Sequence, residues 1–238
     1  MNFLKPFYSR ISELKFSISA DQGSAFAKTV AGDFNPIHHA ASKRFCVPGD
    51  LLFAIALNEY SLHQYMTFQF LDIVSADIIL DYPKQPAAQS ETQLQVVNDY
   101  GKPVLGVEYT GGVTYQPDQI EQFLKNYVSF SGQNFPHILV PLMREHQVMI
   151  NPKRPLVIYQ SMSFKFDHLN FNALDISLEK TTLEVNGRRG DAKLYFSLNS
   201  KGCSIGAGIK KLVLSGLREY DQQVIQKMCD DYLASKTD

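Results

Sequence analysis

Gly32-Asp33-Phe34-Asn35-Pro36-Ile37-His38 is the most informative stretch of this 238-residue chain. It places a carboxylate, Asp33, and an imidazole, His38, on either side of a stiff turn. Two such groups that face one pocket can take a proton from water near neutral pH and return it. Pro36 fixes φ and biases Asn35 toward extended backbone, so the turn is expected to be rigid. The structural alternative is that Asp33 caps a turn and His38 is an ordinary packed histidine.

The stretch, with the segment before it from residue 16, resembles the entry to the MaoC-like, R-specific enoyl-CoA hydratases. In that family a short helix runs into the motif GDxNPxH, and all of its fixed positions are present here. The resemblance implies a hot-dog fold, in which a curved antiparallel sheet wraps around one long helix. It also implies addition of water to trans-2-enoyl thioesters, or the reverse reaction, with Asp33 and His38 activating the water. A bacterial group of uncharacterised two-part hot-dog proteins is also similar.

The next segment, residues 44–57, resembles the family's central helix and the turn before it. In the family a Gly at the start of that helix offers its N–H to the thioester carbonyl, and Gly49 matches that position. Free N–H groups and positive partial charge at a helix N-terminus suit a developing enolate oxygen. Asp50 is expected to be the N-cap of this helix, and Asn35 is expected to brace the motif turn.

Three departures from the family pattern favour a rival interpretation. Pro48 stands where the family often has His, Ala40 stands where it usually has Asp, and the spacer between His38 and Gly49 is shorter. The rival is a non-catalytic hot-dog protein that binds an acyl ligand or a protein partner. Function must be inferred from the site and not from the fold, so both interpretations stay open at this point.

Composition limits the class of protein. The chain is 45% hydrophobic with a formal net charge of -1, which permits a sizeable core and argues against nucleic acid or an anionic membrane as partner. Cys46, Cys203 and Cys229 are few and widely spaced, which fits a reducing cytoplasm without disulfides or structural zinc. We read Cys46 as a small packed residue and not as a nucleophile. No secretory signal and no apolar run long enough to span a membrane is present.

The order of predicted elements indicates an α+β protein with two antiparallel sheets, each wrapped around a central helix. In the first half, residues 1–117, Ser19 and Gln22 form a capping-box pattern before a short helix, and the central helix is expected over residues 50–64. Strands are expected from residue 73 onward, over residues 75–82, 92–98, 102–109 and 113–115, with a hairpin at residues 99–101.

The second half, residues 118–238, repeats the order of helix and then strands without the motif. Helical spacing begins at Asp118, and another helix is expected over residues 136–147, kinked or interrupted at Pro141. Strands are expected over residues 156–166, 174–185, 192–198 and 209–214. Asn186-Gly187 predicts a hairpin, and residues 217–233 predict an amphipathic helix. Lys210 and Lys211 are expected to be solvated surface charges. The two halves are expected to join their sheets edge to edge, with the second half contributing shape to an acyl cavity.

These patterns predict a double hot-dog protein whose site residues are Asp33, Asn35, His38 and Gly49. The expected substrate is an acyl-CoA or acyl-carrier thioester, and no metal or redox cofactor is implied. The expected assembly is a monomer that is an internal pseudo-dimer, or a homodimer.

Overall fold

The structure is a computed structural model, and it describes residues 1–85 and 91–236. Parts of both expected halves, residues 86–90 and 237–238, lie outside this description. The strands are β1 (Ser9–Arg10), β2 (Lys15–Ser17), β3 (Leu62–Phe70), β4 (Ile79–Asp81), β5 (Glu91–Asn98), β6 (Pro103–Thr114), β7 (Val148–Met149), β8 (Val157–Phe166), β9 (Asp175–Asn186), β10 (Arg189–Ser200), β11 (Cys203–Ser215) and β12 (Arg218–Glu219). The α-helices are α1 (Ala20–Phe26), α2 (Gly49–Tyr60), α3 (Pro117–Gly132), α4 (Val140–Glu145) and α5 (Gln222–Ala234), and shorter helical segments are η1 (Asn2–Phe7), η2 (Ala27–Ala31), η3 (Pro36–His38) and η4 (Phe135–Leu139).

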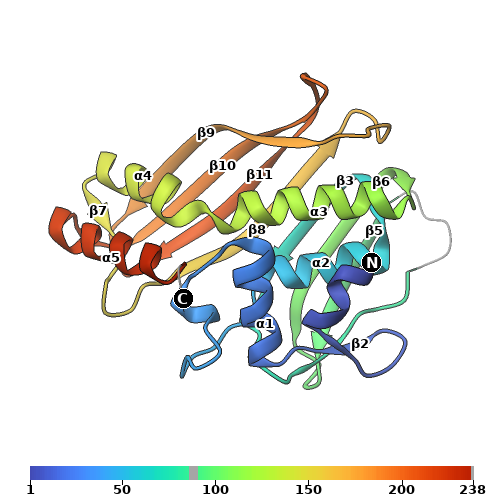
Figure 1. Ribbon diagram of the computed structural model, residues 1–238, viewed down its shortest axis with the longest axis horizontal. Coiled ribbons are helices and arrows are strands. Elements are labelled where there is room, and N and C mark those ends of the chain that lie inside the picture. The colour runs from blue at the N-terminus through green and yellow to red at the C-terminus, as the bar shows by residue number, and fades with distance from the viewer. Residues whose placement is uncertain (86–90, 237–238) are drawn as a thin grey trace.

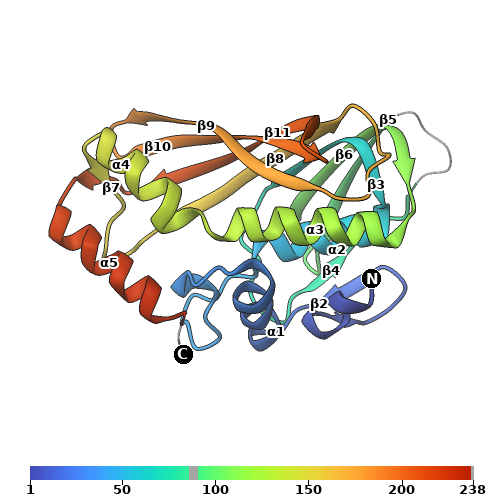
Figure 2. The same ribbon diagram turned by 45° about the horizontal axis from the view of Figure 1, so that its top comes forward.

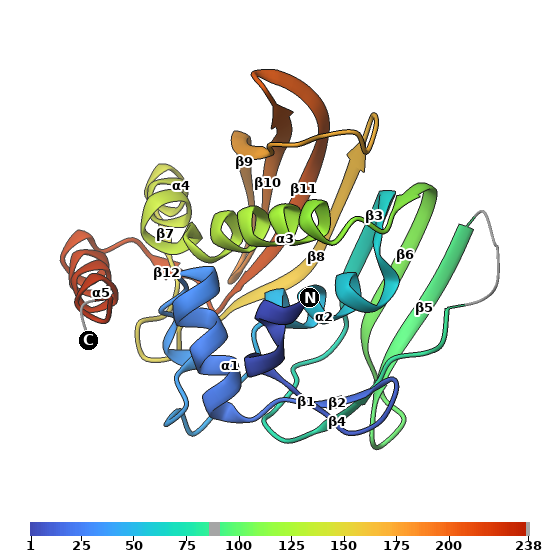
Figure 3. The same ribbon diagram turned by 45° about the vertical axis from the view of Figure 1, so that its right-hand side comes forward.

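Ten strands form one antiparallel sheet in the order β1-β2-β4-β5-β6-β3-β8-β11-β10-β9. The two expected sheets are therefore joined into one, and the junction is the pairing of β3 with β8, in which Tyr65–Gln69 lie opposite Ser161–Lys165. Strands β12 and β7 form a separate two-stranded sheet. The large sheet curves around α2 and α3, which lie on one of its faces (Figures 1 to 3).

Helix α2 is buried on every side, as its apolar sequence predicts. Every residue from Leu51 to Leu57 is at most 3% exposed. Helix α3 is amphipathic and presents Phe123 and Tyr127 to the core. The rings of Phe53 on α2, Phe68 on β3, Phe123 on α3 and Phe164 on β8 contact one another, with centroid distances from 4.7 to 6.4 Å. This aromatic cluster packs the junction of β3 and β8 against both helices, within a hydrophobic core that both halves share. A second hydrophobic cluster, which includes Met143, Leu194 and Leu214, lies within the second half.

Local sequence signals account for many of the element boundaries. Ser19 and Gln22 form the expected capping box at the start of α1. Gly101 and Gly187 have positive φ in the tight turns between β5 and β6 and between β9 and β10, which a glycine adopts at little cost. Helix α3 begins at Pro117, where a proline is tolerated because its missing N–H has no helical partner.

Several predicted boundaries were wrong. The central helix ends at Tyr60 and not at residue 64, and residues 62–70 form β3, a strand that the sequence patterns did not predict. Of the strand expected over residues 75–82, only Ile79–Asp81 is β-structure. The helix expected over residues 136–147 ends at Glu145 and is divided between η4 and α4, and this interruption near Pro141, which has no N–H to continue one regular helix, was expected. Helix α5 begins at Gln222, where the Asp221 side chain accepts two backbone N–H bonds.

The junction of β3 and β8 predicts how the first half behaves alone. Expressed without residues 118–238, residues 1–117 lose the partner of β3 and expose its backbone edge beside Met66 and Phe68. An exposed edge next to apolar side chains drives self-association. We expect this fragment to be insoluble or to pair with itself, measured by light scattering after size-exclusion chromatography, with the full chain as control. A soluble monomeric fragment with a native circular dichroism spectrum would contradict this expectation.

Candidate active site

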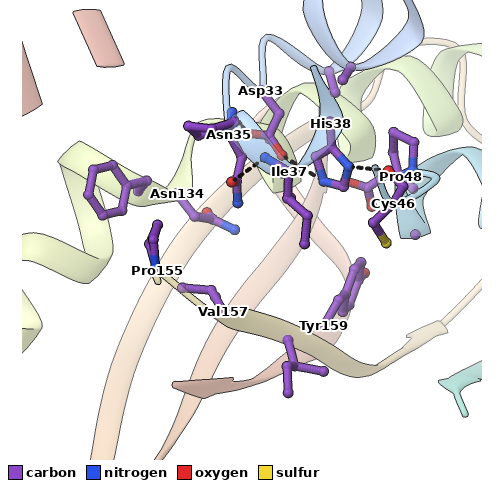
Figure 4. A pocket seen from close by; sticks show the side chains of 18 of the residues that line it. Asp33, Asn35, Ile37, His38, Cys46, Pro48, Asn134, Pro155, Val157 and Tyr159 are labelled. Atoms are coloured by element: carbon purple, nitrogen blue, oxygen red, sulfur yellow. Dashed lines mark hydrogen bonds and ion pairs between the residues drawn. The ribbon is translucent and has the colours of Figure 1, made fainter. Parts of the chain in front are cut away.

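A cavity of about 720 Å³ lies where the two halves meet. Figure 4 shows the motif loop on one side of this cavity and β8, with Val157 and Tyr159, on the other. Residues from both halves line it, and they include Asp33, Asn35, His38, Gly49 and Asp50 from the first and Ser131, Asn134, Tyr159, Lys210 and Tyr232 from the second. All four site residues predicted from the sequence therefore line one cavity, together with residues from distant parts of the chain.

The motif folds into a loop that its own side chains brace. Gly32 ends η2 with a φ of 63°, in the left-handed region that favours glycine. The Asp33 Oδ1 atom accepts the Asn35 N–H at 2.9 Å, and the Asn35 Oδ1 atom accepts the Ile37 N–H at 3.2 Å. Pro36 starts η3, where its fixed φ suits a helical turn. Asn35 braces the turn, as expected, and Asp33 uses one carboxylate oxygen in the loop.

The second oxygen of Asp33 faces the ring of His38. Its Oδ2 atom lies 3.6 Å from His38 Nε2, and the side chains of Asp33 and His38 are 24% and 14% exposed. That distance is too long for a hydrogen bond, but one water can lie within hydrogen-bond distance of both atoms. His38 Nδ1 lies 2.7 Å from the Cys46 carbonyl oxygen, which can only accept. Nδ1 therefore carries the proton, and Nε2 of the neutral ring has a free lone pair on the Asp33 side.

The N-terminus of α2 lies at the same cavity, which Gly49 and Asp50 line. Gly49 is the first residue of α2, and no acceptor bonds its N–H in the part of the chain that the structure describes. A Cβ atom on Gly49 would lie 3.1 Å from the rings of Phe70 and Tyr159, so a side chain here would crowd the cavity wall. The N-cap position is taken by Pro48, and the prediction that Asp50 caps this helix was wrong.

Asp50 is instead part of a buried polar network. Its Oδ2 atom accepts the Ser131 hydroxyl at 2.6 Å, and Lys210 Nζ donates to Ser131 Oγ at 2.6 Å and to the Ser131 carbonyl at 2.9 Å. Burial raises the pKa of the Asp50 carboxyl, and the nearby Lys210 charge opposes that rise. Burial also lowers the pKa of Lys210, and Asp50 and Asp33 oppose that change.

The expectation that Lys210 is a solvated surface charge was wrong, since the residue is only 4% exposed. Successive strand residues face opposite sides, and Lys210 is the member of the adjacent lysine pair that β11 turns toward the helices. Its Nζ atom also lies 4.4 Å from the centroid of the Tyr159 ring, which favours a nearby cation. The sequence held no signal that distinguished Lys210 from Lys211. An error of one residue in the predicted register of the strand exchanges which of the two lysines faces the core.

Two contacts from the second half hold the motif loop. The Tyr232 hydroxyl on α5 accepts the Phe34 N–H at 3.4 Å and lies 3.3 Å from the Gly32 carbonyl and 3.4 Å from the Gly132 carbonyl. Burial raises the pKa of Tyr232 to about 12, so its hydroxyl remains a donor at neutral pH. At the end of α3, a Cβ atom on Gly132 would lie 2.1 Å from the Ala31 carbonyl oxygen. Sequence reasoning missed both residues, because their partners are about 100 to 200 positions away.

Other features of the structure bear on the class of site. No group of three or more His, Cys, Asp or Glu side chains that could hold a metal occurs in residues 1–85 and 91–236. No helix in the same ranges is both long and apolar enough to cross a membrane. Separately from these findings, the cavity holds the acid–base groups Asp33 and His38 and the backbone N–H of Gly49, a set suited to proton transfer beside a carbonyl group.

The architecture and comparisons with solved structures support a hot-dog fold. A tesB protein of Mycobacterium avium subsp. paratuberculosis aligns with a TM-score of 0.52 at 9% identity, over 90% of this chain and 98% of that one. A candidate thioesterase II of Thermobifida fusca aligns with a TM-score of 0.50 at 10% identity, over 88% and 95%. A conserved protein of unknown function with hot dog fold from Alicyclobacillus acidocaldarius gives 0.48 at 10% identity, over 90% and 98%. These likenesses concern the fold.

This chain belongs to the DUF3581 family, described as a protein of unknown function, whose sequence profile matches residues 2–223. No curated protein sequence matches the chain. The profile covers all ten strands of the large sheet and the motif, so the cavity described above lies largely within the family region.

The close approach of α3 to the motif generates one prediction. Replacing Gly132 with Ala places a methyl group against the backbone of Ala31, which must move with the motif loop that follows it. Overpacking of this kind costs about 1–3 kcal/mol, occasionally more. We expect a lower free energy of unfolding by at least that amount in urea, while Gln133→Ala, at the exposed neighbouring position, stays within about 0.5 kcal/mol of the wild type. Equal stability of the two variants would contradict the close contact.

A second prediction concerns the thiol beside His38. Burial raises the pKa of Cys46 to about 11. Because only the thiolate reacts, roughly one molecule in a thousand has a reactive Cys46 at pH 8, and the fraction grows as the pH rises toward the pKa. We expect iodoacetamide to modify the exposed Cys203 first and Cys46 slowly, measured by peptide mass spectrometry. Fast labelling of Cys46 at pH 8 in folded protein would show that the thiol is activated.

Proposed function

We propose that this chain acts on acyl thioesters and, within that class, adds water to trans-2-enoyl thioesters or removes it from 3-hydroxyacyl thioesters. The observation that carries the proposal is the position of Asp33 and His38, 3.6 Å apart, in the same cavity as the free N–H of Gly49. An acid–base pair on one side and a hydrogen-bond donor for a carbonyl oxygen on the other are what this reaction needs. In finer detail, the motif supports a MaoC-like hydratase.

The geometry supports a simple sequence of steps. The thioester oxygen accepts the N–H of Gly49, and a water lies between Asp33 Oδ2 and His38 Nε2. Nε2 takes one proton from the water while the hydroxyl oxygen bonds to Cβ and the double bond shifts to form an enolate. The negative charge on the enolate oxygen faces the N-terminus of α2, and Nε2 returns its proton to Cα. Nδ1 keeps its proton throughout, because the Cys46 carbonyl holds it.

The finer architecture belongs to the same proposal. We infer that residues 1–117 and 118–238 are two hot-dog units that pair within one chain, as an internal pseudo-dimer. In support, α2 and α3 each precede a set of antiparallel strands, and the two sets meet at β3 and β8. The enzyme would work in the cytoplasm, which suits its three free cysteines, and the reaction as written needs no cofactor.

Hydrolysis of the thioester is the second candidate. The same activated water can attack the carbonyl carbon instead of Cβ, and the charge again develops on the oxygen near Gly49. Two structures that share the fold carry the descriptions tesB protein and candidate thioesterase II, which favours testing this reaction too. The rival without catalysis, an acyl-binding protein, is supported by Pro48 and Ala40 at positions where the hydratase pattern has His and Asp.

One assay separates these candidates. Purified protein is mixed with trans-2-enoyl-CoA of increasing chain length, and with the matching acyl-carrier thioesters, while enoyl absorbance and free thiol are both recorded. We expect enoyl absorbance to fall without thiol release. Asp33→Asn and His38→Ala should each lower the rate by about a hundredfold or more, the usual contribution of general acid–base groups. The exposed Asp99→Asn and His168→Ala serve as matched controls and should keep the wild-type rate.

Each other outcome identifies a different function. Thiol release that depends on Asp33 and His38 would establish hydrolysis in place of hydration. Saturable binding of the thioesters without either reaction, across chain lengths and carriers, would establish the acyl-binding protein. Activity that survives in both Asp33→Asn and His38→Ala would remove the motif from the mechanism.

A further inference from the structure

We propose that Lys210, through Ser131 and Asp50, positions the N–H of Gly49 and stabilises negative charge on the thioester oxygen bound there. This inference rests on the proposed use of Gly49 as the donor to that oxygen. Lys210 does not itself touch the oxygen in this scheme, and its role is that of a positioning residue whose charge acts at short range.

The network connects three elements that meet only in the folded chain. Lys210 lies on β11, Ser131 in the last turn of α3, and Asp50 next to Gly49 in the first turn of α2. The hydroxyl of Ser131 accepts from the ammonium group and donates to the carboxylate, both at 2.6 Å. Asn134 Nδ2 donates to the Ser131 carbonyl at 2.7 Å, which also accepts from Lys210. The first turn of α2 is therefore tied to a fixed point in the second half.

The energetic cost of this network argues for a functional reason. Asp50, Ser131 and Lys210 are 7%, 4% and 4% exposed, and removing charged groups from water is costly even when they are paired. A hydroxyl separates the two charged groups, so their attraction is weaker than in direct contact. Asp50 Oδ1 and Asn134 Oδ1 also have no hydrogen-bond partner within the described residues. Apolar side chains packed between the halves would avoid these costs. A cavity in which negative charge develops during the reaction, in contrast, benefits from a buried cation.

The charges around the site favour the same assignment. Asp33 and His38 influence the pKa of Asp50, and Asp33 influences the pKa of Lys210, so the network and the acid–base pair share one electrostatic environment. Asp33 and Asp50 both oppose the formation of an enolate in this cavity. Among the described residues that line the cavity, Lys210 is the buried lysine whose positive charge, when protonated, offsets them, and its fixed position requires little reorganisation when the charge appears.

The test uses a ligand that reports negative charge on its thioester oxygen without turnover. Acetoacetyl-CoA forms an enolate with its own near-ultraviolet absorption band, and the fraction of bound ligand in this form measures how well the site stabilises the charge. We expect the wild-type chain to raise this fraction above that of the free ligand at the same pH. Lys210→Met should lower the enolate-to-keto ratio of bound ligand about tenfold, while the affinity for butyryl-CoA changes less than about threefold.

Two further variants separate charge from packing. Lys211→Met changes the neighbouring lysine on the same strand and should keep the wild-type ratio. Asp50→Asn keeps an oxygen that accepts the Ser131 hydroxyl but removes a negative charge, so it should keep or raise the ratio. A purely structural network predicts instead that Lys210→Met and Asp50→Asn lower it together. If Lys210→Met does not fold, the Asp50→Asn result decides, and a fall would overturn the proposal.

Failure of this inference is distinguishable from failure of the proposed function. An enolate band on the wild-type chain that is lost in Lys210→Met, without hydration of any enoyl thioester, would support the network and reject the hydratase. Hydration by the wild type with an unchanged enolate ratio in Lys210→Met would support the hydratase and reject the network. The absence of any enolate increase on bound acetoacetyl-CoA in the wild type would also overturn the inference.

Discussion

The pairing of β3 with β8 is the constraint on which the rest of the structure depends. Five residue pairs join the two sets of strands, and the aromatic cluster of Phe53, Phe68, Phe123 and Phe164 packs beneath them. The pairing of β3 with β8 and the aromatic cluster together fix the distance between α2 and α3, and with it the distance between Gly49 and Ser131. The cavity is lined by the motif loop, by the facing ends of α2 and α3 and by β8, so the register of this strand pair contributes to its shape.

Most elements could be predicted because their signals are local. The capping box of α1, the apolar run of α2, the helical spacing of α3 and the Asn186-Gly187 turn each depend on neighbouring residues. Strand β3 was missed because α2 ends without a glycine or proline to mark its boundary. Ser61 caps the helix with a φ of 65°, and β3 begins at the next residue, Leu62. The helical spacing of apolar residues continues into Leu62 and His63. The alternation of buried and exposed positions in the following residues was therefore not recognised as a strand.

The residues of the candidate site also divide into those that local sequence signals predicted and those that they did not. Asp33, Asn35, His38 and Gly49 could be named in advance because they fall within 17 residues and match one pattern. Ser131, Lys210 and Tyr232 could not, because nothing in their own neighbourhoods indicates that they reach the motif. Asp50 was placed at the right end of the right helix but given a local role, since its actual partner, Ser131, is 81 positions away. Local patterns thus identified one wall of the cavity, and tertiary packing supplied the other.

The joining of both halves in one polypeptide has a consequence for mass action. Were β3 and β8 on separate chains, the fraction of complete cavities would fall on dilution, as for any bimolecular complex. A covalent connection replaces that equilibrium with an intramolecular one, whose effective concentration depends on the linker and not on the amount of protein. The residues from Thr114 to Val157 form this connection, and helix α3, within it, packs against the core that it joins. Each chain therefore carries a complete cavity at any cellular abundance.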